Sequence, residues 1–152
     1  MMLRRDRAMV AVSIVLDVAF HAGRGAVVPA GDIAERLGEA RRGIEPVLQA
    51  LSRAGLLGST RGPKGGYRLG RAARDMRLSE VVAAVRGPEG GEEAAAEPAA
   101  SALGEAVVQP LWEELEAQLV AALEQLTVAD LLRRATAKGL QRPTPEALNF
   151  AI

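Results

Sequence analysis

The chain has 152 residues, 49% of them hydrophobic and 3% aromatic, with one His, no Cys and a formal net charge of zero. This composition excludes disorder of the whole chain and predicts an aliphatic, helical core. The lack of Cys excludes zinc fingers, and no other residue pattern in the sequence indicates a metal or a cofactor. Residues 1–90 carry 15 Lys and Arg against 9 Asp and Glu, and residues 91–152 carry 4 against 10, so only the first segment favours a polyanionic partner.

Three short helices are predicted in the first part of the chain. Apolar residues recur at helical spacing over residues 6–22, and glycines end this run. A second helix is expected over residues 31–38, where Gly38 ends it, and a third over about residues 41–54, before Gly55. This part of the chain is therefore mainly α.

We do not expect the first helix to be a membrane or secretion segment. Its apolar stretch from Ala8 to Phe20 contains Ser13 and Asp17 and is too short to span a bilayer of about 30 Å. A small-residue cleavage site is also lacking. We therefore expect a cytoplasmic protein with no membrane partner. His21, at the end of this helix, is expected to be a capping or surface residue.

A glycine-rich ribbon is predicted next. Residues 56–60 and 67–69 are expected to be two strands, joined by the turn Arg61-Gly62-Pro63-Lys64-Gly65-Gly66, whose glycines supply positive φ angles. A further helix over about residues 78–85 completes this half. The resulting fold class is mainly α with a small two-stranded β wing.

The second half is predicted to be a long helix between less regular segments. Residues 103–126 carry a continuous apolar stripe, and Pro110 either kinks this helix or marks its true start. Thr127 to Asp130 has the pattern of a capping box for a short helix through Ala135. The domain division is therefore a winged DNA-binding domain (1–87), a flexible acidic loop (88–103), a dimerisation helix with the short helix after it (104–137) and a loose tail (138–152).

The apolar stripe of the long helix predicts a dimer interface. A long helix after a small winged domain has too little of its own chain to bury such a stripe, so a second copy is the economical partner. Trp112 on this stripe is interpreted as interface core. The residues assigned to the interface are Leu111, Trp112, Leu115, Leu119, Ala122 and Leu126.

The order helix, turn, helix, ribbon is that of a winged helix-turn-helix, whose second helix enters the major groove of DNA. At the start of that helix, Arg41 and Arg42 can bind guanine or phosphate, and Glu45 can accept from a cytosine amino group. In the turn of the ribbon, Arg61 and Lys64 suit contacts to the sugar-phosphate backbone. These residues predict binding to double-stranded DNA.

Three motifs resemble one known family. They are Leu16-Asp17-Val18-Ala19, Asp32-Ile33-Ala34-Glu35-Arg36-Leu37-Gly38 and, above all, Ser59-Thr60-Arg61-Gly62-Pro63-Lys64-Gly65-Gly66-Tyr67-Arg68-Leu69. In these residues the chain resembles the Rrf-type winged helix-turn-helix transcriptional regulators. The resemblance implies a homodimer that binds a palindromic operator as a repressor. It also implies that Glu45 contacts a base, that Arg61 and Lys64 form the wing and that Arg7 contacts phosphate.

The chain departs from the family pattern in two places. Many members hold an iron-sulfur cluster with three cysteines in the loop before the dimer helix, and this chain has no Cys. In the recognition helix, Gly43 and Pro46 replace the usual Tyr and Gln. Because Pro inside a helix costs about 3 kcal/mol, a late start of this helix is an alternative, in which Arg41 and Arg42 lie in the turn and face phosphate.

Two functions are weighed against each other. The first is a DNA-binding regulator, and the second is a winged-helix module that binds another protein and has lost specific DNA binding, which Pro46 and the missing cluster ligands motivate. An enzyme is not expected, because the sequence offers no nucleophile-base pair, ligand cluster or cofactor loop. A small-molecule effector, a protein partner and constitutive binding all stay open as modes of regulation.

Overall fold

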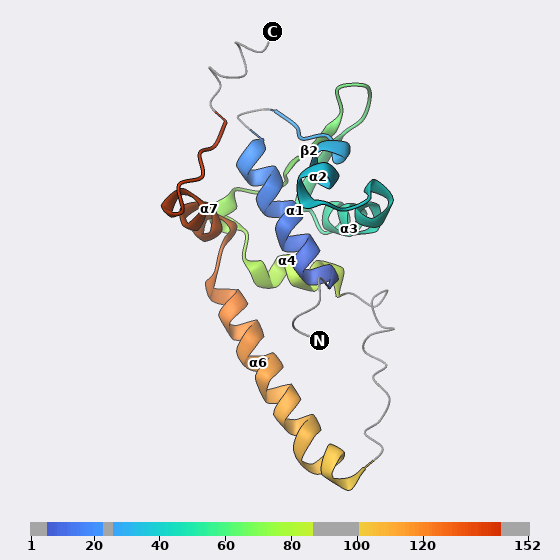
Figure 1. The fold of residues 1–152 in the computed structure, drawn as a ribbon, viewed down its shortest axis with the longest axis vertical. Helices are drawn as coiled ribbons and strands as arrows, with labels where there is room; N and C mark the ends of the chain where they lie inside the picture. The colour runs from blue at the N-terminus through green and yellow to red at the C-terminus, as the bar shows by residue number, and fades with distance from the viewer. Residues whose placement is uncertain (1–5, 23–25, 87–100, 144–152) are drawn as a thin grey trace.

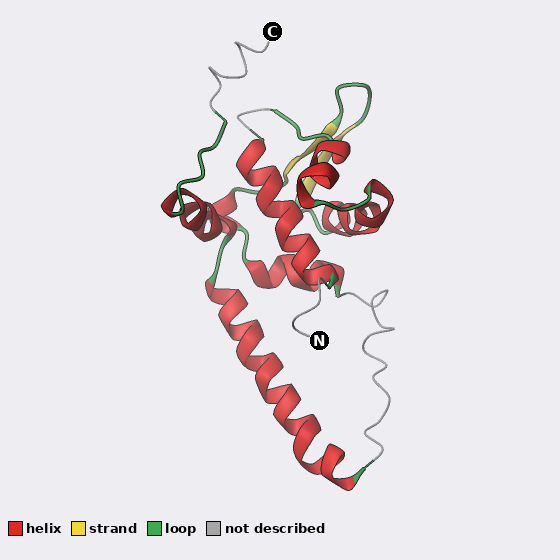
Figure 2. Cartoon of the chain, viewed as in Figure 1, coloured by secondary structure: helices red, strands yellow, loops and turns green. Residues whose placement is uncertain are grey.

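The computed structural model describes residues 6–22, 26–86 and 101–143. Its helices α1, α2, α3 and α4 and the sheet of β1 and β2 form one body, on which α7 also packs, while α6 extends away from it (Figure 1). The sheet is small beside the helices (Figure 2). The predicted fold class, mainly α with a two-stranded wing, is confirmed.

The first three helices begin and end close to the predicted residues. Helix α1 spans Arg7–His21, and the Asp6 side chain accepts a hydrogen bond from the Met9 N–H (3.0 Å) as its N-cap. Helix α2 spans Ala30–Leu37 and ends at Gly38, whose φ of 68° is the left-handed conformation that glycine tolerates. Helix α3 spans Arg41–Arg53.

The core is built around α1. Its buried face packs on α3, α4, α7 and β2, and Ile14, Val18, Ile33, Leu48 and Leu51 are all fully buried. Every buried side chain among the described residues is apolar. The aliphatic core that the composition predicted is therefore present, and it fixes α2 and α3 relative to α1.

The fourth helix, α4, spans Leu78–Val85 as predicted, after a short 3-10 turn, η1, at Ala73–Asp75 that the sequence analysis missed. Glu80 accepts a hydrogen bond from the backbone N–H of Arg77 (3.0 Å). That bond, with the nearby Arg71 guanidinium, lowers the pKa of the Glu80 carboxyl. Glu80 therefore stabilises the first turn of α4 as a carboxylate.

The long helix starts irregularly. A π-helical segment, η3, spans Gly104–Val108 and leads into α6 at Gln109–Gln125. Pro110 lies in the first turn of α6, directly after the π-helical segment, so it marks the start of the regular α-helix within a longer helical stretch. Residues 102 and 103 are already helical, and residues 88–100 of the predicted loop lie outside the described residues.

A short pairing joins the end of α6 to the winged body. Arg77 and Thr127 form an isolated antiparallel β-bridge, and the Arg77 guanidinium donates a hydrogen bond to the carbonyl of Glu124 (2.6 Å) at the end of α6. Next to the bridge, Val128 is 1% exposed and belongs to the core of the winged body. The direction of α6 is therefore set by contacts within one chain.

Helix α7 spans Val128–Ala137 and begins with the predicted capping box. The Thr127 N–H donates to the Asp130 carboxylate (2.8 Å), and the Asp130 N–H donates to the Thr127 hydroxyl (3.2 Å). The bond from the Thr127 backbone is the main cause that lowers the pKa of Asp130, and Arg133 also pairs with this carboxylate. The helix packs on α1. It therefore forms part of the winged body, although it follows α6 in the sequence.

These two carboxylates predict a loss of stability in acid. Because folding lowers the pKa of Glu80 and Asp130, their contribution is complete above the carboxyl pKa values of the unfolded chain, about 4, and is lost as the pH falls through the lower values of the folded chain. We expect Asp130→Asn to unfold more easily at neutral pH and to lose less stability on acidification. Urea unfolding followed by circular dichroism at several pH values measures both effects.

Asp75→Asn is the control, since the Asp75 side chain is 66% exposed. An acid dependence that is equally steep in Asp130→Asn and in the parent chain would contradict the assignment.

Candidate nucleic-acid interface

One face of α3 is free of contacts with the core. Ile44, Val47, Leu48 and Leu51 hold the opposite face in the core. The exposed face carries Arg41, Arg42, Glu45, Pro46 and Gln49. Helical spacing of three, four and seven residues places Arg42, Glu45 and Gln49 in one row. The helix thus presents guanidinium groups, a carboxylate and a carboxamide, all of which can bind base edges in a major groove.

Gln49 is not among the contact residues predicted from the sequence. Its signal was present in the spacing, because Gln49 lies four residues after Glu45 and seven after Arg42. A Gln side chain can bind adenine bidentately. It therefore joins the residues that we assign to base contacts.

The alternative of a late start for α3 is wrong. The helix begins at Arg41, and the N–H groups of Gly43 and Ile44 close its first turn on the Ala40 carbonyl (2.9 and 3.3 Å). The helix continues through Pro46 because the apolar residues around it are anchored in the core, which offsets the missing hydrogen bond. Arg41 and Arg42 therefore lie in the first helical turn, and Pro46 occupies an exposed position without a hydrogen-bonding group.

The wing is an antiparallel hairpin of β1, Leu57–Thr60, and β2, Gly66–Leu69. In its turn Arg61 and Lys64 are exposed, Gly62 has a φ of 108°, and the Gly65 N–H donates to the Gly62 carbonyl (2.9 Å). The hydrogen bond within the turn fixes the backbone that carries both cations. The arrangement suits contacts with a phosphate backbone on either side of a groove.

A third segment pairs with the base of the wing, although the sequence analysis assigned it no role. Val28 and Tyr67 form an isolated antiparallel bridge, with both N–H···O distances 2.8 Å. Gly66 is buried beside this bridge, and a Cβ there would lie 2.5 Å from the Val28 carbonyl oxygen. Close approach of two backbones is therefore the reason for glycine at this position.

We expect Gly66→Ala to lower the free energy of unfolding by about 1–3 kcal/mol, because the added methyl group forces apart two backbone segments. Gly31→Ala is the matched control, since a Cβ at Gly31 meets nothing within 4 Å and Ala favours a helix. Chemical denaturation compares the two variants. Equal stability of Gly66→Ala and the parent chain would show that the wing base tolerates a side chain.

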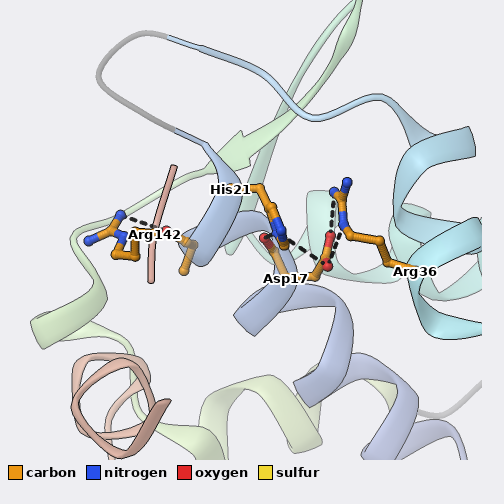
Figure 3. A network of polar contacts seen from close by, with 5 residues as sticks. Asp17, His21, Arg36 and Arg142 are labelled. Carbon is orange, nitrogen blue, oxygen red and sulfur yellow. Dashed lines mark hydrogen bonds and ion pairs between the residues drawn. The ribbon is translucent and has the colours of Figure 1, made fainter. Parts of the chain in front are cut away.

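A polar network ties α2 to α1 (Figure 3). The Arg36 guanidinium donates two hydrogen bonds to the Asp17 carboxylate, both 2.9 Å. His21 Nδ1 lies 2.9 Å from the Asp17 carbonyl oxygen and 3.4 Å from the Asp17 carboxylate, in the last turn of α1. The hydrogen bonds that Arg36 donates to the Asp17 carboxylate raise the pKa of Arg36 above its ordinary value. The network holds α2, and through it the turn before α3, against α1.

We expect Asp17→Asn to destabilise the fold by about 1–3 kcal/mol, since it removes a charged acceptor from a two-bond pair. The Asp17 side chain is only 9% exposed, so water replaces the lost bonds poorly. Thermal and urea unfolding measure the loss, with the exposed Glu35→Gln as the control. An unaltered midpoint in Asp17→Asn would mean that the pair contributes nothing to stability.

The predicted contact residues fall on three elements. Arg41, Arg42 and Glu45 lie on α3, and Arg61 and Lys64 lie in the wing, on the side of α1 away from α7 (Figure 1). Arg7 is exposed at the start of α1, the end of that helix far from the wing (Figure 1). The side chains of all six predicted contact residues, five cations and one carboxylate, are exposed.

The predicted dimer residues are divided between two environments. Leu111 and Trp112 are 48% and 46% exposed, and Ala122 is also exposed. Leu115 and Leu119 are half-buried. Leu126, in contrast, packs against the core of its own winged body.

The chain is similar in sequence to a known family of regulators. The model of the Rrf2 family, described as an iron-dependent transcriptional regulator, matches residues 5–134. The HTH-type transcriptional regulator IscR of Photobacterium profundum is 37% identical over 125 residues, which cover 81% of this chain and 71% of that protein. IscR of Vibrio atlanticus is 35% identical over 125 residues, with coverages of 81% and 70%.

Solved structures agree with the sequence relatives. The structure of T. potens IscR has a TM-score of 0.69 and 27% identity and covers 90% of each chain. That of CymR, the global cysteine regulator of B. subtilis, has a TM-score of 0.64 and 21% identity and covers 86% of this chain and 96% of its own. No helix among the described residues is long and apolar enough to cross a bilayer. The chain belongs to the Rrf2 family of transcriptional regulators and is a DNA-binding regulator, not an enzyme.

Proposed function

We propose that the chain is a homodimeric repressor that binds a palindromic operator through α3 and the wing. The single observation that carries this proposal is the exposed row on α3, with Arg42, Glu45 and Gln49 at helical spacing, next to a wing whose turn carries two exposed cations. Residues 1–87 would bind DNA and residues 104–137 would dimerise. A dimer seated on an operator represses by excluding other proteins from the same DNA.

Each side chain has a distinct proposed role. Arg42 and Gln49 bind purine edges, and Glu45 accepts from a cytosine amino group. Arg41, Arg61 and Lys64 neutralise phosphates, as does Arg7 if the duplex extends past the start of α1. Glu45→Ala should therefore relax the base preference at one position, whereas loss of a phosphate contact weakens binding to all sequences alike.

The dimer is proposed to form along α6. Helix α6 has no buried residue within its own chain, and Leu111, Trp112 and Val120 expose 48%, 46% and 40% of their surface. Large apolar side chains exposed to this extent are unfavourable in water and suit burial against a second copy related by a twofold axis. A twofold dimer presents two copies of α3, which matches a palindromic site.

We also propose that this regulator works without a Cys-ligated iron-sulfur cluster. Cys thiolates are the usual ligands of such clusters, and the whole chain contains none. In the described parts of the chain, no group of three or more His, Asp or Glu side chains is arranged to hold a metal ion. The residues present do not fit the cluster of the iron-dependent members, so operator binding should be the same after aerobic and anaerobic preparation.

Selection of bound sequences from a random duplex library tests the proposal. The selection is repeated at low and moderate salt, because phosphate contacts make DNA binding salt-dependent. Enrichment of a palindrome that depends on Glu45 supports the proposed operator binding. Negligible binding at low salt, with no enriched sequence, would overturn it and favour a module that binds another protein.

A further inference from the structure

A pocket lies where the end of α1, the wing strand β2 and α7 meet. Its volume is about 340 Å³, near the lower end of the range for ligand sites. The walls consist of four alanines, Leu69, Leu132 and two arginines, Arg68 and Arg142. The space exists because small side chains from several elements meet there, and its size suits a small molecule.

The charges around this pocket favour an anion. Two of its lining residues are cationic, and none of the described lining residues is acidic. The Arg142 guanidinium donates a hydrogen bond to the Ala19 carbonyl (2.8 Å), beside the end of α1 (Figure 3). Because a guanidinium carries about five N–H donors in a planar fork, most of them stay available, and this fork matches a carboxylate.

The same pocket touches elements with separate roles in the proposed regulator. Arg68 lines it and also donates to the Thr60 hydroxyl (3.1 Å), directly before the wing turn. Leu132 belongs to α7, which follows the α6 helix of the proposed dimer. A ligand here contacts the wing strand and α7 together, so a ligand that prefers one arrangement of these elements changes DNA affinity.

We propose that this pocket binds a small organic carboxylate, with its apolar body against the alanines and leucines and its carboxylate on Arg142, and that binding changes operator affinity. The second half of this proposal rests on the proposed operator binding. The first half does not, because a ligand site can be measured without DNA.

Calorimetric titration of the full chain with butyrate, benzoate and phenylacetate tests the site, and each acid is paired with its neutral amide. We expect at least one acid to bind and its amide to bind about tenfold more weakly, the effect of losing a charged partner. Arg142→Gln should weaken the acid about tenfold, and Ala73→Leu should fill the pocket and abolish binding. Arg134→Gln, an exposed Arg of α7 outside the pocket, should bind like the parent chain.

The proposed site is wrong if none of the three acids binds, or if an acid binds equally to the parent chain and to Arg142→Gln. Arg142→Gln keeps this test valid even where Ala73→Leu misfolds. Fluorescence anisotropy with the selected operator then tests regulation, for which we expect a change in Kd of at least about threefold. If the ligand leaves the operator Kd unchanged, the pocket is a binding site without a regulatory role. If the protein fails to bind the operator even without ligand, that result counts against the proposed function and not against the binding site.

Discussion

Replacing Arg61 and Lys64 together by Ala is expected to weaken operator binding by about ten- to a hundredfold. Both side chains are exposed in the wing turn and lie outside the paired residues of the hairpin. Each is proposed to neutralise one phosphate, and the release of counterions makes such contacts a large part of the binding free energy. The slope of log K against log salt should fall by about 2, one for each lost cation.

The matched control is Arg134→Ala with Lys138→Ala. These residues are also one Arg and one Lys, both exposed, at the end of α7, which lies on the other side of α1 from α3 (Figure 1). Fluorescence anisotropy at several salt concentrations compares the two double variants. If the two double variants lose the same amount of operator affinity, the wing does not contact DNA directly, and its cations act only through the overall charge of the protein.

The structure explains why so small a wing can position charges. Its turn is closed by the Gly65 hydrogen bond to Gly62, and its base is held by the bridge between Val28 and Tyr67. Gly66→Ala disturbs the base while it leaves both cations in place. It should therefore weaken DNA binding as well as stability, whereas the alanine pair in the turn should weaken DNA binding only.

Features that depend on neighbouring residues were predictable from the sequence. The end of α2 at Gly38 and the capping box of Thr127 and Asp130 both lie where the sequence predicts them. Each needs only residues within one helical turn of the helix end. The exposed positions of α3 likewise follow from the period of its apolar residues.

Features that depend on distant residues were not predictable. The pairing of Arg77 with Thr127 and the bonds from Arg36 to Asp17 join segments far apart in the sequence. No local pattern marks such partners, because they are chosen by how the helices pack. The continuation of α3 through Pro46 has the same origin, since tertiary packing offsets a local cost.

The second large effect is expected for Leu111→Glu. The Leu111 side chain is 48% exposed on α6 within one chain, so the substitution should leave the fold of the protomer intact. In the proposed dimer it places an unpaired carboxylate in an apolar interface, which should raise the dimer dissociation constant by about a hundredfold or more. Sedimentation velocity measures the shift from dimer to monomer.

Loss of the dimer should also remove most of the operator affinity, because a monomer contacts one half-site and no longer gains from the second. The bridge between Arg77 and Thr127 fixes α6 to the winged body. The way in which the two copies of α6 pack in the proposed dimer therefore sets the distance between the two copies of α3. Gln109→Glu is the control, since it adds the same charge at an exposed position two residues earlier, on a different face of the helix. A Leu111→Glu chain that still sediments as a dimer would exclude α6 as the interface, and a monomeric parent chain would exclude the dimer itself.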